Sequence, residues 1–109
     1  MTKKQPKLQK LQGVLEELTS IDPEFPIQWA MVFVDVAMNE GSALKDVSDR
    51  TGISMSVMSR TVGALSNARR MGKPYGLVTV RSSKEDARRR ELYLSSRGKK
   101  LLENLKKKV

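Results

Sequence analysis

The sequence predicts a mainly α-helical fold that includes one small β-hairpin. Apolar residues recur at helical spacing over most of the chain, glycines and prolines separate the helical segments, and alternating apolar residues occur in one short region of the second half. The chain has 109 residues, of which 39% are hydrophobic, and this is enough for one modest core. We therefore expect a single domain over residues 1–109.

A stripe of leucines in region 4–20 predicts the first helix, between about Pro6 and Ser20. The stripe has helical spacing and consists of Leu8, Leu11, Leu15 and Leu18. Pro23 and Pro26 follow and prevent a continuous helix, and Pro26 suits the first position of a new one. The sequence therefore predicts a turn between two helices.

The segment from Ile27 to Asn39 is apolar almost all round, which is typical of a helix buried on several sides. We interpret its methionine and aromatic residues as core packing rather than as the lining of a ligand pocket. Gly41 is expected to cap the C-terminus of this helix, and Ser42 is expected to begin the next one.

Two helices joined by a tight turn are predicted over residues 43–70. A short helical pattern from Ala43 to Thr51 ends at Gly52, and Ser54 can cap a longer helix that runs to about Arg70. Glycine suits a turn that needs a positive φ. The arrangement is that of a helix-turn-helix motif.

Side chains within residues 44–65 fit this motif. Ser48 is small where the two helices are expected to touch. The residues expected to face the core are Val47, Ile53, Met58 and Val62. Short helical hairpins with a glycine turn also arise by chance, so the motif needs support from its surroundings.

The second helix of the motif has polar and small residues opposite its apolar face. Small hydroxyl side chains let a helix lie deep in the major groove of DNA, Arg60 can donate two hydrogen bonds to guanine, and free N–H groups at the helix N-terminus favour phosphate. The alternative is an ordinary solvated helix face. The candidate recognition residues are Ser54, Ser56, Ser59, Arg60, Gly63, Asn67 and Arg70.

A β-hairpin is predicted over residues 77–94, directly after this helix. The run from Leu77 to Val80 is apolar and β-branched, polar residues 82–86 form a turn, and alternation between Glu91 and Leu94 indicates a returning strand. Ser95 can cap a final helix over residues 95–109. The apolar residues of that helix are Leu101, Leu102 and Leu105. The whole pattern predicts a winged helix-turn-helix fold.

Basic residues gather on the predicted wing. A hairpin tip is narrow enough to enter the minor groove or follow the DNA backbone, where arginine is favoured by the negative potential. Asp86 is expected to orient the guanidinium of Arg88. Three consecutive arginines on a strand cannot all point to one side, so one of them is expected to face solvent or to be structural. The candidate wing residues are Arg81, Lys84, Arg88, Arg89 and Arg90.

The net charge of +9 is unevenly distributed. Residues 1–50 carry 6 Lys/Arg and 8 Asp/Glu, a net charge of −2, whereas residues 51–109 carry 15 and 4, a net charge of +11. A one-sided positive field attracts polyanions, although a cationic tail such as Lys106–Lys108 is common in proteins without nucleic-acid partners. The second half is therefore the expected polyanion-binding part.

The chain contains no cysteine and no histidine. Their absence removes the usual ligands of zinc, haem and copper and the commonest general base. The close acidic pairs lie on segments that are expected to be solvated, without a further metal ligand: Glu16 and Glu17, Asp46 and Asp49, Glu85 and Asp86. We expect no enzymatic activity, no catalytic residue, no cofactor and no metal site.

The most apolar stretch, Pro26–Met38, has 13 residues and contains Asp35. A membrane-spanning helix needs roughly 20 apolar residues, so a core helix is the better interpretation. The N-terminal lysines precede no apolar run that ends in a cleavage site. We expect no membrane association and a cytoplasmic location.

The stretch from Asp86 to Gly98 combines two recognisable patterns. Asp86-Ala87-Arg88 has the form Asp, any residue, Arg, and Leu92 begins a Leu-Tyr-Leu-Ser passage that is followed by Gly98. In these features and in the helix-turn-helix, over roughly residues 43–98, the chain resembles the MarR family of bacterial and archaeal regulators. The resemblance implies a homodimer that reads a palindromic operator, with the recognition helix in the major groove and Arg88 in or near the minor groove.

Two features depart from that family. The segment from Ser66 to Gly76 is longer than the usual exit from the recognition helix, and only eleven residues follow Gly98, whereas the family dimerises through long helices at both ends. We therefore expect no family-like ligand pocket. Dimerisation is expected through regions 4–20 and 95–109, whose leucines would serve equally as core: Leu8, Leu11, Leu15 and Leu18, with Leu101, Leu102 and Leu105.

The predicted function is sequence-specific binding of double-stranded DNA by a transcriptional regulator, most simply a dimeric repressor. One alternative is a winged-helix interaction module of a replication, packaging or polymerase complex, but serines make poor protein hot spots. Another is a non-specific architectural or RNA binder. The few aromatic residues, with Trp29 and Phe33 expected in the core, do not favour the stacking of single-stranded bases.

Overall fold

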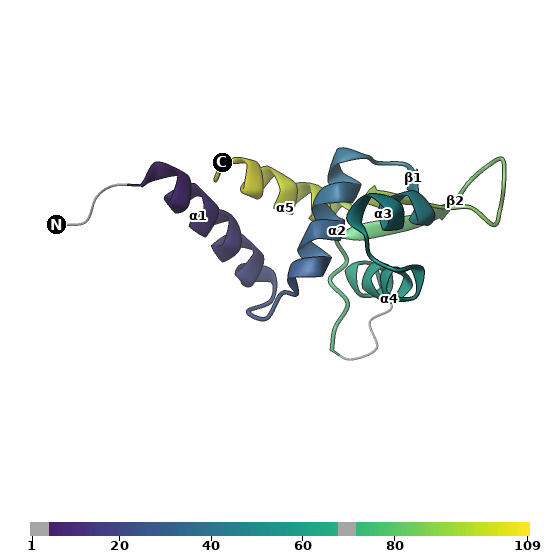
Figure 1. The fold of residues 1–109 in the computed structure, drawn as a ribbon, viewed down its shortest axis with the longest axis horizontal. Coiled ribbons are helices and arrows are strands. Elements are labelled where there is room, and N and C mark those ends of the chain that lie inside the picture. Colours follow the sequence, from purple (N-terminus) through teal and green to yellow (C-terminus); the bar gives the residue numbers. More distant parts are fainter. Residues whose placement is uncertain (1–4, 68–71) are drawn as a thin grey trace.

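The computed structural model describes residues 5–67 and 72–109 of the chain. Figure 1 shows α1 reaching out at one end of the molecule and the hairpin loop after β2 at the other, with the remaining helices between them. In chain order, the elements of the described residues are α1 (Pro6–Ile21), α2 (Ile27–Met38), β1 (Ser42–Ala43), α3 (Leu44–Thr51), α4 (Met55–Leu65), β2 (Val78–Ser82), β3 (Arg90–Leu94) and α5 (Ser96–Lys106).

The three strands form one antiparallel sheet with the order β1-β3-β2. β2 and β3 form the predicted hairpin, in which Val80 pairs with Leu92. The two-residue strand β1 was not expected. It is held by its pairing with β3 and by the N–H of Gly41, which donates to the carbonyl oxygen of Leu92 at 2.8 Å.

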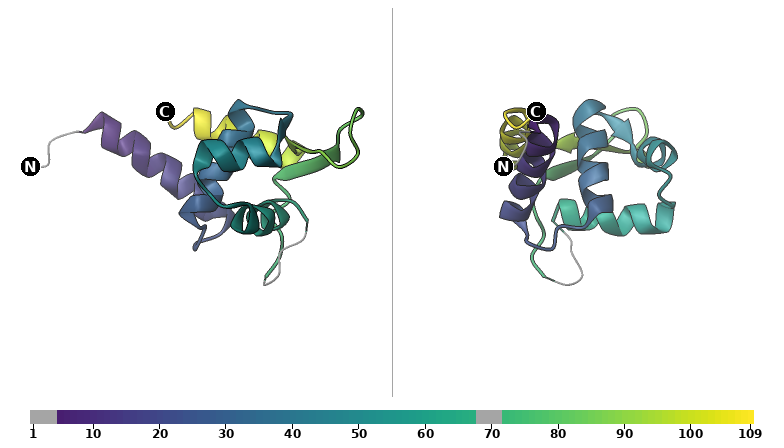
Figure 2. Two further views of the ribbon diagram at one scale, coloured as in Figure 1. Left: turned by 45° about the vertical axis from the view of Figure 1, so that its right-hand side comes forward. Right: turned by 60° about the vertical axis from the view of Figure 1, so that its left-hand side comes forward.

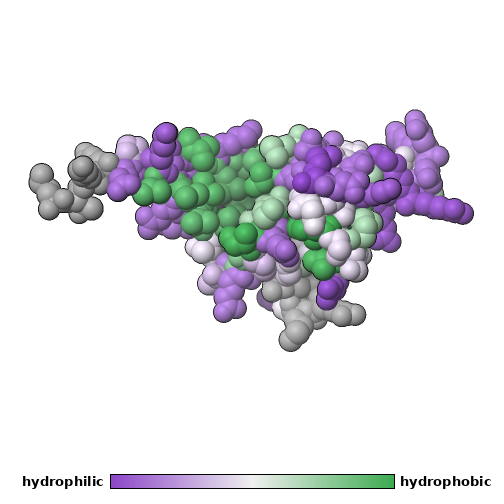
Figure 3. All heavy atoms as spheres, viewed as in Figure 1, coloured by the Kyte–Doolittle hydropathy of each residue, from purple (hydrophilic) through white to green (hydrophobic). Residues whose placement is uncertain are grey.

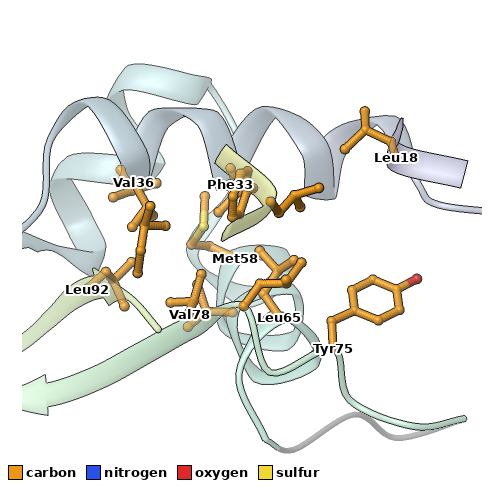
Figure 4. Close-up of a cluster of buried hydrophobic side chains, with 14 of the residues drawn as sticks. Leu18, Phe33, Val36, Met58, Leu65, Tyr75, Val78 and Leu92 are labelled. Carbon is orange, nitrogen blue, oxygen red and sulfur yellow. The ribbon is translucent and has the colours of Figure 1, made fainter. Parts of the chain in front are cut away.

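The core lies between α2, α4, the sheet and α5. Its largest fully buried apolar side chains include Phe33, Met58, Leu65, Leu77 and Leu92. Figure 4 shows Phe33 of α2 and Met58 of α4 turned toward one another above the sheet residues. The four positions of the helix-turn-helix that were predicted to face the core are all buried, as predicted: Val47, Ile53, Met58 and Val62.

The prediction that α2 is buried on several sides is wrong for one of its faces. Phe33 is buried and Trp29 is partly buried, but a stripe at helical spacing stays exposed. It consists of Ile27, Met31, Val34 and Met38. The rest of the helix contacts α3, α4 and β3, whereas α1, which precedes the turn at residues 22–26, points away from α2 in Figure 1.

The leucines of the terminal helices divide into two groups. α1 and α5 lie side by side in Figure 2, and their contact buries Leu18, Leu101 and Leu105, which therefore belong to the core of the chain itself. Leu102 is partly buried. The stripe of Leu8, Leu11 and Leu15 is exposed, at 56%, 54% and 44%.

The caps proposed between α2 and α3 need correction. α2 ends at Met38 with Asn39 as its C-cap rather than Gly41, and Ser42 belongs to β1, so that Ala43 is the N-cap of α3. The reason is tertiary. Gly41 has a φ of +91° and turns its N–H toward β3, while the Ser42 hydroxyl donates to the carbonyl of Asn39 at 2.7 Å.

The recognition-helix candidate α4 ends at Leu65, five residues before the predicted end at Arg70. The last carbonyl oxygens of α4 accept hydrogen bonds from the returning chain: Tyr75 N–H donates to Ala64, and Leu77 N–H donates to Leu65. These donors replace the amides of a continued helix. Arg70 itself lies outside the described residues.

The returning segment is fixed by an aromatic cluster. The hydroxyl of Tyr75 donates to Asp22 Oδ2 at 2.5 Å, and its ring stacks on Phe25 with centroids 5.0 Å apart and meets the edge of Trp29 at 5.6 Å. The turn between α1 and α2 therefore holds the chain that leads from α4 into the hairpin.

A half-buried ion pair joins α2 to α3. Arg50 Nε and Nη2 donate to the carboxylate of Asp35 at 3.0 Å, and Nη2 also donates to the Ser42 hydroxyl at 2.8 Å. The hydrogen bond with Asp35 raises the pKa of Arg50 above its ordinary value. The pair fixes the first helix of the helix-turn-helix on the core.

None of the helices within the described ranges has the length and hydropathy that a membrane span requires.

Candidate nucleic-acid interface

The turn between α3 and α4 has the geometry that the sequence predicted. Gly52 has a φ of +75°, in the left-handed region, and its N–H donates to the carbonyl of Ser48. Ser48 is buried, and its hydroxyl donates to the carbonyl of Ile53 at 2.5 Å. A small hydroxyl residue therefore closes the turn and sets α4 across α3.

α4 begins at the predicted N-cap, since the Ser54 hydroxyl accepts a hydrogen bond from the N–H of Val57 at 3.5 Å. One side of the helix is buried, including Met58, Val62 and Leu65. Ser56, Ser59 and Arg60 are exposed on the other side. We call this the outward side of α4; Gly63 also lies on it and is partly exposed. Asn67 is exposed just beyond the end of the helix.

A groove of about 520 Å³ separates α4 from the hairpin. Arg60 lines it from the α4 side and Arg90 from β3, so each wall includes an arginine. Strand residues 80, 90 and 92 share one face of the sheet because they alternate with 81, 91 and 93. The groove is lined by Leu44, Ser59, Arg60, Val62, Gly63, Ser66, Asn67, Val80, Arg90 and Leu92.

A second, adjoining groove of about 410 Å³ lies between the start of α3, the start of α4 and the end of the wing loop. It is lined by Ala43, Leu44, Lys45, Met55, Arg88, Arg89 and Arg90. Leu44 and Arg90 line both grooves, which are therefore neighbours. Sequence reasoning missed Lys45 and Met55, because only the fold brings the start of α3 and the first residue of α4 to the wing.

The wing loop is shaped by its own backbone. Ser83 N–H donates to the carbonyl of Arg89 at 2.8 Å, and Asp86 Oδ1 accepts from the backbone N–H of Arg88 at 2.9 Å. The expectation that Asp86 orients the Arg88 guanidinium is therefore replaced by a role in the turn. The loop projects from the body in Figure 1 and in the left view of Figure 2, with Lys84 and Arg88 exposed on it.

The wing arginines have different surroundings, as the strand alternation led us to expect. Arg89 is the structural one: its guanidinium lies 3.7 Å from Asp46 and 3.5 Å from Glu91. Arg81 lies on the far face of the sheet, 4.8 Å above the ring of Tyr93, and lines a separate hollow with Lys84. The fold thus brings Arg90 and Arg88 toward α4 and keeps Arg81 away from it.

No protein-family model matches this sequence, and no curated protein is similar enough to count as a relative. Solved structures do match its fold. The S. aureus MepR–DNA complex has a TM-score of 0.75 at 15% identity, covering 94% of this chain and 77% of that one. The repressor CouR, bound to a 23-mer DNA duplex, gives 0.69 at 22%, covering 94% and 66%. A MarR transcriptional regulator from Methanosarcina mazei gives 0.68 at 19%, covering 94% and 69%.

At these identities the likeness is one of fold. It confirms the predicted fold class, a mainly α-helical winged helix-turn-helix with a small sheet, in the form found in MarR-type regulators. The chain spans 56% to 77% of the length of such structures.

Proposed function

We propose that this chain is a sequence-specific, double-stranded-DNA-binding transcriptional regulator, most simply a dimeric repressor that acts in the cytoplasm. The observation that carries the proposal is the outward face of α4, where small polar residues and Arg60 border a groove whose other wall carries Arg90. Two structures of the same fold are complexes with DNA, and one of these is of a repressor.

The outward face of α4 fits the major groove. Its small side chains allow close approach of the helix backbone, and Arg60 has the donor geometry to bind guanine O6 and N7. The free N–H groups at the helix start favour a phosphate. We assign base reading or close approach to Ser54, Ser56, Ser59, Arg60, Gly63, Asn67 and Arg70.

The wing fits the neighbouring minor groove and the strand between the two grooves. Arg88 stands on the projecting loop, where it can follow the backbone or enter the minor groove, whose negative potential favours arginine. Arg90 lines the groove between α4 and the wing, where we place the DNA strand that separates the two DNA grooves. Lys84 contributes charge at the loop, and Arg89 and Arg81 support the wing through their contacts with Glu91 and Tyr93.

A second copy of the chain is the proposed partner of the exposed apolar surface of α1. Leu8, Leu11 and Leu15 form a stripe that the described residues leave exposed, and the stripe of α2 adds to the exposed apolar area. Figure 3 shows apolar surface gathered on the α1 side of the molecule, away from the hydrophilic wing. A two-fold pair formed through α1 would leave α4 and the wing free for DNA.

Binding-site selection from a random duplex library tests the proposal. A dimer with two recognition helices about one helical turn apart should select a pseudo-palindrome with half-sites about 10 base pairs apart. The matched control is Arg60→Ala, which should lose the preference at one base pair of each half-site. A library that remains random after selection with the unaltered chain would contradict the proposal.

A further inference from the structure

An exposed methionine stands in the most basic part of the candidate interface. Met55 is the first residue of α4 and is 45% exposed. In the described part of the helix-turn-helix and wing, the exposed large apolar side chains are Met55 and Val80; the others lie on α1, on α2 or at the C-terminus. A single exposed apolar residue is ordinary on a protein surface, but Met55 stands among basic side chains on the proposed recognition helix, where the edge of a base would meet it.

The surroundings of Met55 define what such a ligand carries. Lys45, Arg88 and Arg90 line the same groove of about 410 Å³, and the partly buried Leu44 adds a second apolar side chain to it. Arg89, which also lines the groove, is engaged by Asp46 and Glu91. The groove therefore offers cations for phosphates beside the apolar side chains of Met55 and Leu44.

Thymine combines these two features in duplex DNA. Its C5-methyl group projects into the major groove, close to the sugar-phosphate backbone of its own strand, and apolar side chains are its usual partners. We propose that Met55 is a specificity-determining residue that packs on the methyl group of a thymine, while Lys45, Arg88 and Arg90 hold neighbouring phosphates. This inference rests on the proposed function and adds an apolar contact to it.

The position of Met55 on the helix agrees with this role. Met55 and Ser59 are four residues apart, so they share one side of α4, and each lines a groove beside the wing. Helical spacing turns Arg60, which also borders the first of these grooves, farther outward. Met55 thus reaches the edge of the major groove rather than its centre. A flexible thioether adapts to a methyl group more readily than a branched side chain does.

Replacing thymine by deoxyuridine tests the inference, because it removes only the methyl group. The probe is the duplex enriched by binding-site selection, with each thymine replaced in turn. The chain should bind about fourfold more weakly at one thymine of each half-site, the value of burying one methyl group. Met55→Gln, which keeps the length of the side chain, should bind the thymine and deoxyuridine duplexes equally there, and Met55→Leu should keep the preference.

Val109→Gln provides the matched control, because Val109 is also an exposed apolar residue, at 72%, but lies at the C-terminus, outside the α4 and wing grooves and outside the apolar stripes of α1 and α2. Its thymine-to-deoxyuridine ratio should equal that of the unaltered chain. If no thymine shows a methyl effect, or if Met55→Gln retains it in full, the inference is wrong although the proposed function stands. If selection enriches no sequence at all, the proposed function fails and the inference falls with it.

Discussion

Arg60 is the residue whose side chain we expect to read a base most directly. It is exposed on the outward side of α4, and the described residues provide no ion-pair partner for its guanidinium. Arg60→Ala should cost about 1–3 kcal/mol in binding of the cognate duplex and relax specificity at one base pair. Competition binding against duplexes with single base changes measures both effects.

Lys84→Ala is the control for charge alone. Lys84 lies on the wing loop, so its loss should weaken binding to all sequences by a similar factor and lower the salt dependence. An Arg60→Ala variant that behaves like Lys84→Ala would show that Arg60 binds phosphate and reads no base.

Gly98 is needed for packing rather than for turning. A Cβ atom at this position would overlap the carbonyl oxygen of Leu77, which accepts a hydrogen bond from Ser95 N–H. We expect Gly98→Ala to lower the free energy of unfolding by about 1–3 kcal/mol, as overpacking does. Denaturant unfolding provides the measurement.

Gly52 is needed for its backbone conformation, whereas Gly98 is needed for close packing, and Gly52→Ala tests the first of these requirements. Its Cβ would meet nothing within 4 Å, so only the positive φ opposes the substitution, at about 1–2 kcal/mol. Unchanged stability of Gly98→Ala would mean that α5 lies farther from Leu77 than in the structure.

The residues whose roles the sequence predicted correctly form hydrogen bonds with groups only a few residues away in the chain. Ser54 and Ser95 cap the helices that follow them, and Gly52 and Ser48 close the tight turn. Gly41 and Ser42 were misassigned because β3, about fifty residues away, takes the N–H of Gly41. Residue types near a helix end predict its cap well, except where a residue that could cap the helix forms its hydrogen bond with a strand that is distant in the sequence.

At the scale of elements, the length of α4 and the surroundings of α2 were mispredicted for related reasons. Periodicity extends α4 to Arg70, but hydrogen bonds from the chain around Tyr75 occupy its last carbonyl oxygens. Apolar content suggests that α2 is enclosed, but one stripe stays exposed. The end of α4 and the exposure of α2 both depend on where a distant segment of the chain passes. The periodicity of apolar residues within a helix carries no information about that.

The exposed stripe of α1 leads to a prediction about assembly. Leu11→Glu places a charge in the middle of the stripe and should convert a dimer to a monomer. Size-exclusion chromatography with light scattering measures the mass, and affinity for the two-half-site duplex should fall with it. Gln9→Glu makes a similar change on the exposed surface of the same helix and should leave the dimer intact. A Leu11→Glu variant that stays dimeric would place the interface elsewhere.

The ion pair between α2 and α3 supports the orientation of the helix-turn-helix. Asp35→Ala removes the carboxylate that Arg50 binds in three hydrogen bonds and should cost about 1.5–3 kcal/mol of stability, the usual value for hydrogen bonds to a charged group. Asp49→Ala, an exposed carboxylate on α3, should change stability by less than about 0.5 kcal/mol. Thermal unfolding of the two variants compares them, and equal midpoints would contradict a role for the pair.

Across the whole molecule, charge and apolar surface are separated along the chain. The first fifty residues, net −2, build α1, α2 and most of α3, and the remainder, net +11, builds α4, the wing and α5. Two copies that meet through α1 thus keep their basic parts apart. The composition indicated this division, but the grooves beside α4 required the fold, since they combine residues from α3, α4 and β3.

Sequence-specific binding of duplex DNA is the central claim, and fluorescence anisotropy across a salt series tests it most directly. The probes are a duplex enriched by selection and a scrambled duplex of the same composition. We predict that the enriched duplex binds at least about 10³-fold more tightly at physiological salt. Equal, weak binding to both duplexes that falls steeply with salt would reduce the interface to phosphate contacts, and it would contradict the claim.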